Sequence, residues 1–446
     1  MKNEEKDQVC ILGMGYVGLT LAVVMAECGY NVTGIEINPE TCDSLQEGTA
    51  HFYEVGLNSR LARQLKLGNL CFTRDYRSDL VRRCTIFVLT VGTPLGEDGL
   101  PRMDMVQRAT TQVAESMPDG SLVILRSTVK LGTSRSIVKP ILDDSKKNYM
   151  LAYCPERTIE GKALEELRYL PQVVGGLASD HAWRATQLFQ RVTPTTIRVS
   201  SLEAAELVKL LDNSYRDLFF SFGNEVSLLC EAAGLDGIEV ITAANTGYER
   251  TNIARPGLVG GPCLEKDPHI LAVSTLQYGF TPKLITTGRA LNEDLPNQII
   301  RLIDQDMQST PIAPDAKIAV CGLAFKGRPE TDDLRGTPVK YLIKSLRERH
   351  PNCRLVGQDF AVKEAGIRSL GLEPASLEDA FAGSQLVLIA NNNAKYQWVD
   401  TDKLFASMAQ PGLVFDIWNV LQTNHDLVQP GVRYTRLGSS TAWRSK

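Results

Sequence analysis

Residues 8–36 are QVCILGMGYVGLTLAVVMAECGYNVTGIE. The apolar run over residues 8–13 predicts a buried strand, and residues 19–29 predict a helix that ends at a glycine. The turn between them has the pattern G-x-G-x-x-G, formed by Gly13, Gly15 and Gly18. Small residues at these places let the backbone approach a pyrophosphate at the positive N-terminus of a helix. The stretch therefore predicts a dinucleotide-binding strand, turn and helix.

The residue at the end of the next strand indicates which dinucleotide is bound. That strand, residues 31–36, ends at Glu36, about 20 residues after the glycine turn. A carboxylate there binds a ribose 2′-hydroxyl and repels a 2′-phosphate, which predicts NAD rather than NADP. Tyr16 and Val17, within the turn, are the other expected cofactor contacts. The alternative is a tight turn that needs glycine only for packing, followed by a surface glutamate.

Size and charge bound the class of protein. The chain has 446 residues, 43% of them hydrophobic, and a single core stops growing at roughly 250–300 residues, so we expect at least two domains. The net charge of −4 offers no basic field for nucleic acid or anionic lipid. The sequence shows no signal-peptide pattern and no apolar run of the roughly 20 residues that cross a bilayer. We therefore expect a cytoplasmic protein with neither nucleic acid nor membrane as a partner.

The order of apolar runs predicts the fold class. Apolar, β-branched runs alternate with helical stretches through residues 1–199, the pattern of a doubly wound parallel sheet. The alternation returns over residues 312–446 after a proline-containing linker. We therefore predict an α/β protein with two Rossmann-like doubly wound domains joined by a long central helix. Residues 200–311 form the central helical region in this interpretation.

The predicted central helix begins at a capping box formed by Ser200 and Glu203 and continues to Gly234 without an internal proline. Its length exceeds the average about two-fold, and apolar residues lie on more than one of its sides. We expect it to link the domains and to pack against a second subunit, which makes a homodimer. Burial of the helix within a monomer is the alternative.

Eight motifs together resemble those of the UDP-glucose/GDP-mannose dehydrogenase family, in family order and over the whole chain. The motifs are GMGYVGL, FYEVGL, VGTP, RSTVKLGT, CPERTIEG, ELVKLLDNSYR, GGPCLEKDP and AFKGRPETDDLRGTP. The resemblance implies an N-terminal NAD domain, a central dimerisation region and a C-terminal domain that binds a UDP-sugar. It also implies a net four-electron oxidation that uses two NAD, and it implies no metal.

Oxidation of an alcohol to an acid in one site requires a group that captures the aldehyde, because a free aldehyde can leave before the second hydride transfer. A thiolate does this. Cys263 lies in the predicted loop GGPCLEKDP with Lys266, whose charge favours a thiolate, and with glycines that permit close substrate approach. Taken alone, a loop cysteine is more often inert. The resemblance implies that Cys263 is the nucleophile, which forms a thiohemiacetal and then a thioester.

Two residues of the long helix are candidates for stabilising charge on the substrate oxygen. Lys209 and Asn213 are four residues apart and therefore project from one face, where a cation and an amide donor can hold an oxyanion. By spacing alone they are a solvated lysine and a surface asparagine. The resemblance implies the oxyanion role, adds Asp267 as the group that assists proton removal through water, and adds Thr128 as a residue that holds this water.

Glu156 and Glu160 correspond to two family glutamates near the reacting carbon, of which the later one is the favoured base for thioester hydrolysis. A carboxylate must deprotonate or orient the attacking water in that step. Without the motif, a charged loop is the simpler interpretation.

The resemblance implies further contacts. For NAD they are Thr93, Lys266 and Arg335, and for the sugar nucleotide they are Glu156, Arg157, Lys209, Asn213, Asn252, Gly260, Phe325 and Lys326. Arg250 corresponds to an arginine that reaches the substrate of the neighbouring subunit, so the dimer completes the site. The alternative for Arg250 is a surface arginine. Glu36 replaces the aspartate commoner in the family, which lengthens the reach to the ribose without changing the charge.

The segments CPERTIEGKALEELRYLPQVVGG and ERTNIARPG are most similar to the branch that acts on UDP-N-acetylhexosamines, especially UDP-N-acetylmannosamine. The product is then a uronate for capsule, O-antigen or other surface polysaccharide synthesis. UDP-glucose 6-dehydrogenase is the alternative within the family.

Two alternatives lie outside that family function. A two-electron dehydrogenase of the hydroxyacid or 6-phosphogluconate type has no use for Cys263. A catalytically inactive sensor of NAD or a nucleotide sugar should have lost some of Cys263, Lys209, Asn213 and Asp267, but all four are present.

Overall fold

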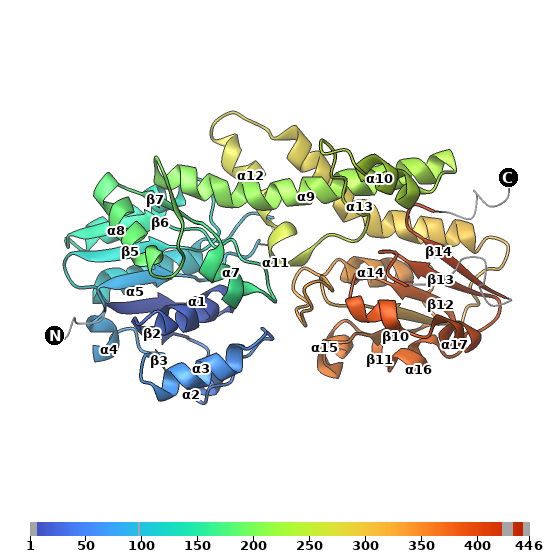
Figure 1. The fold of residues 1–446 in the computed structure, drawn as a ribbon, viewed down its shortest axis with the longest axis horizontal. Helices are drawn as coiled ribbons and strands as arrows, with labels where there is room; N and C mark the ends of the chain where they lie inside the picture. Colours follow the sequence, from blue (N-terminus) through green and yellow to red (C-terminus); the bar gives the residue numbers. More distant parts are fainter. Residues whose placement is uncertain (1–6, 97–98, 422–430, 440–446) are drawn as a thin grey trace. The chain divides into compact units, whose positions relative to one another are not determined.

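The computed structural model of the protein describes residues 7–96, 99–421 and 431–439. The chain forms two compact units, one from Met1–Asp212 with His269–Thr281 and the other from Asn213–Pro268 with Pro282–Lys446. Each unit contains one sheet with helices packed on it (Figure 1). The predicted α/β fold class, with two Rossmann-like sheets and a long central helix, is confirmed. The division into three domains stays a prediction.

The sheet of the first unit has eight strands in the order β3-β2-β1-β4-β5-β6-β7-β8. The strands are β1 Gln8–Leu12, β2 Asn31–Ile35, β3 Leu70–Thr73, β4 Ile86–Leu89, β5 Ser121–Leu125, β6 Tyr149–Tyr153, β7 Gln172–Gly176 and β8 Thr196–Val199. All neighbours pair in parallel except β6 and β7. The order of the first six strands is that of the dinucleotide-binding Rossmann fold.

The helices of this unit connect successive strands. They are α1 Tyr16–Glu27, α2 Pro39–Gln46, α3 Leu57–Lys66, α4 Asp79–Arg82, α5 Asp104–Ser116, the π-helix η1 Ser134–Val138, α6 Lys139–Asp144, α7 Ala163–Tyr169 and α8 Ser179–Gln190.

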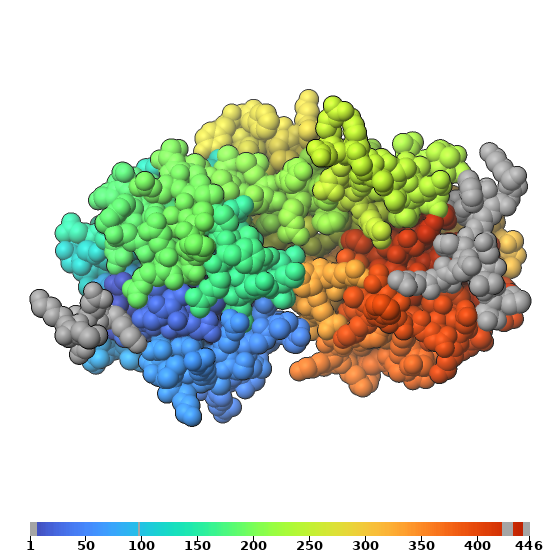
Figure 2. Space-filling model, viewed as in Figure 1, coloured from blue at the N-terminus to red at the C-terminus, as the bar shows by residue number. Residues whose placement is uncertain are grey.

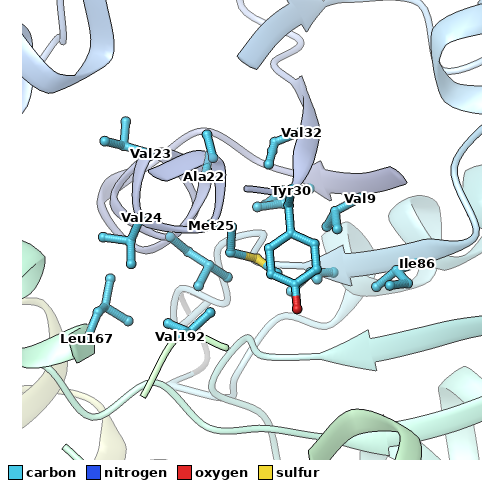
Figure 3. Close-up of a cluster of buried hydrophobic side chains, with 14 of the residues drawn as sticks. Val9, Ala22, Val23, Val24, Met25, Tyr30, Val32, Ile86, Leu167 and Val192 are labelled. Carbon is cyan, nitrogen blue, oxygen red and sulfur yellow. The ribbon is translucent and has the colours of Figure 1, made fainter. Parts of the chain in front are cut away.

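The central strands of the first sheet, β1, β4 and β5, are buried on both faces, as their continuous apolar sequences predict. Side chains alternate between two clusters, so that Val9 and Ile11 pack in one and Cys10 and Leu12 in the other. Figure 3 shows the first cluster, where α1 residues such as Met25 lie beside the strands. Helix α1 is buried from Gly18 to Ala26, which fixes the start of this helix against the sheet.

The second unit repeats this strand order with six parallel strands, β11-β10-β9-β12-β13-β14. The strands are β9 Lys317–Cys321, β10 Arg354–Gln358, β11 Glu373–Pro374, β12 Ser384–Ile389, β13 Gly412–Asp416 and β14 Val432–Arg436. Its connecting helices are α14 Val339–Arg349, α15 Glu364–Ser369, α16 Leu377–Phe381, the 3₁₀ helix η2 Ala394–Trp398 and α17 Thr401–Ala406. The unit also contains α10 Gly237–Asn245, α11 Gly261–Leu264 and α13 Lys283–Asp306, whereas most of α12 Asp267–Leu276 belongs to the first unit.

The long helix is α9, Leu202–Ala233, and the boundary between the two units falls within it. The predicted capping box is wrong in one respect, because the hydroxyl of Ser201 rather than Ser200 accepts the Ala204 N–H, at 3.1 Å. Glu203 pairs instead with Arg135, at 2.6 Å. A hydroxyl caps a helix only where it faces a free N–H, and here that position is one residue later. Within the described residues, no helix combines the length and the apolar character that a membrane span needs.

Candidate active site

The glycine turn between β1 and α1 has the geometry of a pyrophosphate site. Gly13 has φ +93°, in the region that favours glycine, and a Cβ atom at Gly18 would overlap the carbonyl oxygen of Gly13. At Gly15 a Cβ atom would meet nothing within 4 Å, which leaves open space beside the start of α1. The first turn of α1 has neither a side-chain cap nor an acidic residue. These features suit a phosphate, since the positive end of the helix dipole faces the open space.

Glu36 lies directly after β2, where the ribose of a dinucleotide is expected. Its carboxylate accepts the Met14 N–H at 3.2 Å and the Asn38 N–H at 2.9 Å. These bonds hold the carboxylate beside the glycine turn. The residues of the turn and Glu36 therefore fit NAD.

The loops after β4 and β5 lie side by side in the first unit. The Thr93 hydroxyl donates to the Thr128 carbonyl at 2.5 Å, and the Ser127 hydroxyl donates to the Val91 carbonyl at 2.7 Å. The structure thus brings together two residues that were expected to serve NAD and the reacting water. Both follow the carboxyl ends of parallel strands, where ligands of such sheets bind.

Glu156 is held by a buried arginine that the sequence analysis did not single out. Arg126 donates to one oxygen of Glu156 through Nε at 3.1 Å and Nη2 at 2.5 Å, and it is 2% exposed. The other oxygen accepts the N–H groups of Arg157 and Thr158, both at 2.7 Å. Burial raises the pKa of Glu156, but the charges of Arg126 and Lys209 and the Thr158 N–H together hold it below its ordinary value. Glu156 is therefore a saturated carboxylate, poorly suited to accept a proton.

Glu160 lies four residues further along the same loop and is half-buried. Arg157, between the two glutamates, forms an ion pair with Asp212 of the long helix at 2.7 Å. In the same unit Lys209 is 7% exposed, and its charge acts on Glu156. Lys209 is thus not the solvated lysine that spacing alone suggested.

In the second unit a buried carboxylate joins three predicted site residues. Asp267 is fully buried and accepts from the side-chain amide of Asn213 at 2.5 Å and from Nζ of Lys266 at 2.9 Å. Burial lowers the pKa of Lys266, but the negative charges of Asp267 and Cys263 outweigh this effect and raise it. A cation held this close favours the thiolate form of the cysteine.

Cys263 lies in the one-turn helix α11, and the prediction that it lies in an irregular loop is wrong. The glycine-rich stretch is irregular only up to Gly260, because Pro262 has the fixed φ that suits the first turn of a helix. Cys263 is exposed, whereas the other nine of the ten cysteines, all of which the structure describes, are buried or half-buried. The chain thus presents one thiol to solvent.

The turn that carries Cys263 packs against the segment after β9. The Gly261 N–H donates to the Gly336 carbonyl at 2.7 Å, and a Cβ atom at Gly260 would overlap the same carbonyl. A Cβ atom at Gly261 would run into the Phe325 ring, and Nζ of Lys326 lies 5.3 Å from the centre of that ring. The structure therefore brings the predicted substrate residues Gly260, Phe325 and Lys326 to the turn that carries Cys263.

A second buried arginine, also absent from the predicted set, supports this turn. Arg289 donates to the Leu264 carbonyl at 2.9 Å and to Asp217 at 2.7 Å, and it is 3% exposed. Its position within α13 gave no sequence signal, since an arginine on a helix is usually solvated. The bond to Leu264 fixes the residue next to Cys263.

Three predicted contacts lie at the surface of the second unit. Arg335 donates to Asp333 at 2.7 Å and has a side chain that is 64% exposed. Arg250 lies over the ring of Tyr248, 4.7 Å from its centre, and Asn252 is exposed nearby in sequence. The roles of these residues toward NAD and substrate stay predictions, as do those of the other site residues.

One unit contains a dinucleotide turn. The other contains an exposed cysteine and a sheet that repeats the Rossmann strand order. These features define an NAD-dependent dehydrogenase with an additional nucleotide-binding unit. The chain matches the NAD binding domain of the UDP-glucose/GDP-mannose dehydrogenase family over residues 7–193, the central domain over 203–294 and the UDP binding domain over 319–423. It belongs to this family. The resemblance of the motifs, the NAD cofactor and the dehydrogenase class are thereby confirmed.

Similar proteins align over nearly their full length. A UDP-N-acetyl-D-mannosamine dehydrogenase of Pyrococcus horikoshii is 32% identical over 424 residues, 93% of this chain and 96% of the relative. The solved UDP-D-ManNAc dehydrogenase of that organism has a TM-score of 0.87 at 30% identity and covers 97% and 99% of the two chains. A UDP-glucose dehydrogenase of Pyrobaculum islandicum has a TM-score of 0.86 at 25% identity and covers 99% of each chain.

Replacing Gly15 with alanine is expected to weaken NAD binding without destabilising the fold. The added methyl group enters the open space at the start of α1, so the Kd for NAD should rise about tenfold or more. Calorimetric titration measures the Kd, and thermal denaturation measures stability. Gly18→Ala is the matched comparison, because its methyl group overlaps Gly13 and should also lower the Tm. Equal NAD affinity in Gly15→Ala and the wild type would contradict this placement of the cofactor.

Glu206, on α9, is expected to make stability depend on pH. Its carboxylate is fully buried and accepts the N–H groups of Gly132 at 2.6 Å and Ser134 at 2.8 Å, which follow Thr128 in the loop. Burial raises its pKa to about 7, so between its ordinary pKa and pH 7 the folded state holds a proton that the unfolded chain has lost. Stability contributed by the protonated form is therefore lost as pH rises through this window, by on the order of 3 kcal/mol.

Thermal denaturation of the wild type and Glu206→Gln between pH 5 and pH 8 measures this effect. Glutamine does not titrate in this range, so the Tm of the wild type should fall relative to the Tm of the variant as pH rises. A constant difference across the range would show that Glu206 does not carry the proton.

Proposed function

We propose that the protein oxidises the C6 hydroxyl of a UDP-N-acetylhexosamine to the carboxylate. The favoured substrate is UDP-N-acetylmannosamine. The observation that carries the proposal is the single exposed thiol, Cys263, held beside Lys266 and the buried Asp267. A family that oxidises alcohols with NAD needs such a thiol only where the aldehyde is to be retained and oxidised again. The similarity to UDP-N-acetyl-D-mannosamine dehydrogenases supports the choice of sugar.

The first step is the oxidation of the alcohol to an aldehyde. NAD, when bound, accepts a hydride in each of the two oxidations. Lys209 and Asn213 lie one turn apart on α9 and stabilise the negative charge that develops on the C6 oxygen as its proton leaves. Asp267 fixes the amide of Asn213 and assists removal of the proton through a water that Thr128 holds.

The second step forms a covalent bond to Cys263. Its thiolate attacks the aldehyde carbon, which makes a C–S bond and places the electron pair of the carbonyl on oxygen. Lys209 and Asn213 hold this oxyanion in the same way. Loss of a hydride from that carbon restores the carbonyl as a thioester.

The third step is hydrolysis of the thioester. Water attacks the carbonyl carbon, its proton passes to Glu160, and the C–S bond breaks with the electron pair returning to sulfur. Glu160 is favoured over Glu156 because both oxygens of Glu156 already accept two hydrogen bonds. Glu156 instead holds the backbone of the loop that carries Glu160.

The uronate product suits synthesis of capsule, O-antigen or another surface polysaccharide, and a cytoplasmic enzyme would meet both NAD and the nucleotide sugar. UDP-glucose oxidation is the alternative within the family. An inactive sensor is disfavoured, because the buried Asp267 binds both Asn213 and Lys266 in the unit that carries the exposed Cys263.

An assay with NAD and a panel of UDP-glucose, UDP-galactose, UDP-N-acetylglucosamine, UDP-N-acetylmannosamine and GDP-mannose tests this function. We expect two NADH per uronate from UDP-N-acetylmannosamine, and loss of uronate formation in Cys263→Ala, because the aldehyde is no longer captured. NADH absorbance and product mass are the measurements. Cys353→Ala removes a half-buried thiol of the same unit and serves as the control. Turnover of UDP-glucose alone would contradict the choice of sugar, and one NADH per substrate would contradict the four-electron reaction.

We propose a homodimer formed through α9. On this helix four apolar side chains are exposed, Leu211 (45%), Tyr215 (68%), Phe222 (53%) and Leu229 (64%). The last three repeat every seven residues and therefore form a stripe along one side of the helix. Side chains of the α9 and α10 region, green to yellow-green, lie at the surface in Figure 2. A stripe of this kind is typical of a helix that packs on another chain.

Tyr215→Asp combined with Phe222→Asp is expected to convert the dimer to monomer, since two buried charges at an interface cost several kcal/mol. Sedimentation velocity measures the mass. Activity should fall with the dimer, because Arg250 is expected to reach the partner's substrate. Trp398→Asp, at a side chain that is 82% exposed on η2, controls for the loss of a surface aromatic residue. A wild-type protein that sediments as a monomer would overturn the proposal.

A further inference from the structure

The segment FYEVGL, residues 52–57, has no role in the reaction described above, yet it contains a buried carboxylate. Glu54 is 6% exposed. A carboxylate leaves water at a high cost unless donors replace the lost hydration. The partners of Glu54 therefore indicate what its burial serves.

Both oxygens of Glu54 bind the backbone directly after Glu160. Oε2 accepts the Gly161 N–H at 2.7 Å, and Oε1 accepts the Ala163 N–H at 2.9 Å. Gly161 has φ +90°, so the chain turns sharply immediately after Glu160. The carboxylate thus fixes the turn on one side of the residue that activates water.

The remaining partner of Glu54 comes from the cofactor turn. The Tyr16 hydroxyl donates to Glu54 and accepts the Gly161 N–H at 2.9 Å. Tyr16 is the first residue of α1 and follows Gly15, beside the space that suits a pyrophosphate. Its ring also contacts that of Phe52, with the centres 5.0 Å apart. One hydrogen-bonded cluster therefore joins the dinucleotide turn to the loop that bears Glu160.

The other side of this loop is held independently. Arg126 and Glu156 fix its beginning, and Glu166 of α7 accepts the Ile159 N–H at 2.7 Å. On the far side of Glu160 the Lys162 N–H bonds within the loop, to the Ile159 carbonyl at 3.1 Å, whereas the bonds to Glu54 and Tyr16 connect the loop with the glycine turn.

We propose that Glu54 is a positioning residue that couples the NAD turn, through Tyr16, to the orientation of Glu160 for thioester hydrolysis. The inference rests on the proposed function, in which water attacks the thioester carbon, its proton passes to Glu160 and the Cys263 sulfur leaves. A dinucleotide on the turn limits the movement of Tyr16. Through Glu54 the same restraint reaches the Gly161 and Ala163 amides and fixes the carboxylate between the two anchored ends of its loop.

Hydrogen exchange of the Gly161 and Ala163 amides tests the coupling without turnover. In the wild type we expect NAD to slow this exchange about fivefold or more. In Glu54→Gln the two amides should exchange faster with and without NAD. A glutamine side chain has only one acceptor oxygen and cannot replace both carboxylate oxygens, which accept the Gly161 and Ala163 N–H groups. Tyr16→Phe should keep the protection in the free protein but lose the increase caused by NAD. An NAD effect that persists in both variants would overturn the coupling.

Single-turnover kinetics with UDP-N-acetylmannosamine test the consequence for chemistry. In Glu54→Gln we expect NADH formation to stay near the wild-type rate while uronate release falls about tenfold or more, so that enzyme-bound thioester accumulates in acid-quenched mass spectra. The NAD Kd should change little. Glu165→Gln, at an exposed carboxylate of α7, is the matched control.

The possible outcomes separate the inference from the function on which it rests. Unchanged uronate release in Glu54→Gln would overturn the positioning role, and so would a weakened NAD Kd as the sole effect, because Glu54 would then support only the cofactor turn. A wild-type enzyme that forms one NADH and no thioester would overturn the proposed function instead, and the exchange experiment would still decide the coupling.

Discussion

A charged side chain that leaves water must find partners, and this constraint shapes both units of the protein. Glu54, Glu156 and Asp267 are at most 6% exposed, and each carboxylate is held by several donors. An unpaired buried carboxylate costs several kcal/mol, so removal of any partner would change where the carboxylate lies. The hydrogen bonds that offset the cost of burying a carboxylate also fix the direction of its oxygens. The polar groups are therefore oriented before a ligand binds. Such preorganisation is the chief source of electrostatic catalysis.

The second sheet repeats the order of the first six strands of the first sheet, and this similarity explains where the polar groups lie. Glu36, Thr93 and Thr128 follow β2, β4 and β5, and Phe325 follows β9. In parallel sheets the carboxyl ends of the strands and the following loops form the ligand-binding edge. Each unit thus has its own nucleotide-type edge, one suited to a dinucleotide and the other assigned by the family to UDP. A chain with two such edges can hold a cofactor and a nucleotide-linked substrate without a shared binding surface.

The features that could be predicted from the sequence are those set by local periodicity or by a single residue type. The glycine turn, the strands and the long helix are of this kind, since steric limits and the spacing of apolar residues specify them through residues that are close in sequence. Arg126 was missed because its partner Glu156 lies 30 residues away, and an arginine at a strand end is usually solvated. The cap at Ser201 and the helical turn at Cys263 depend on the local direction of the backbone and side chains. The amino-acid sequence does not give this direction. Glu206 and Arg289 also could not be identified from the sequence, because their importance follows from their burial in the folded protein.

The boundary between the two compact units falls inside α9, between Asp212 and Asn213, and so separates Lys209 from Asn213. The helix is continuous there, and the spacing of these two side chains is set by its internal hydrogen bonds at about 1.5 Å per residue. Their separation therefore does not depend on how the two units are arranged. Helix α9 therefore acts as a fixed spacer, and the distance between the two groups assigned to the oxyanion changes only if the helix itself breaks.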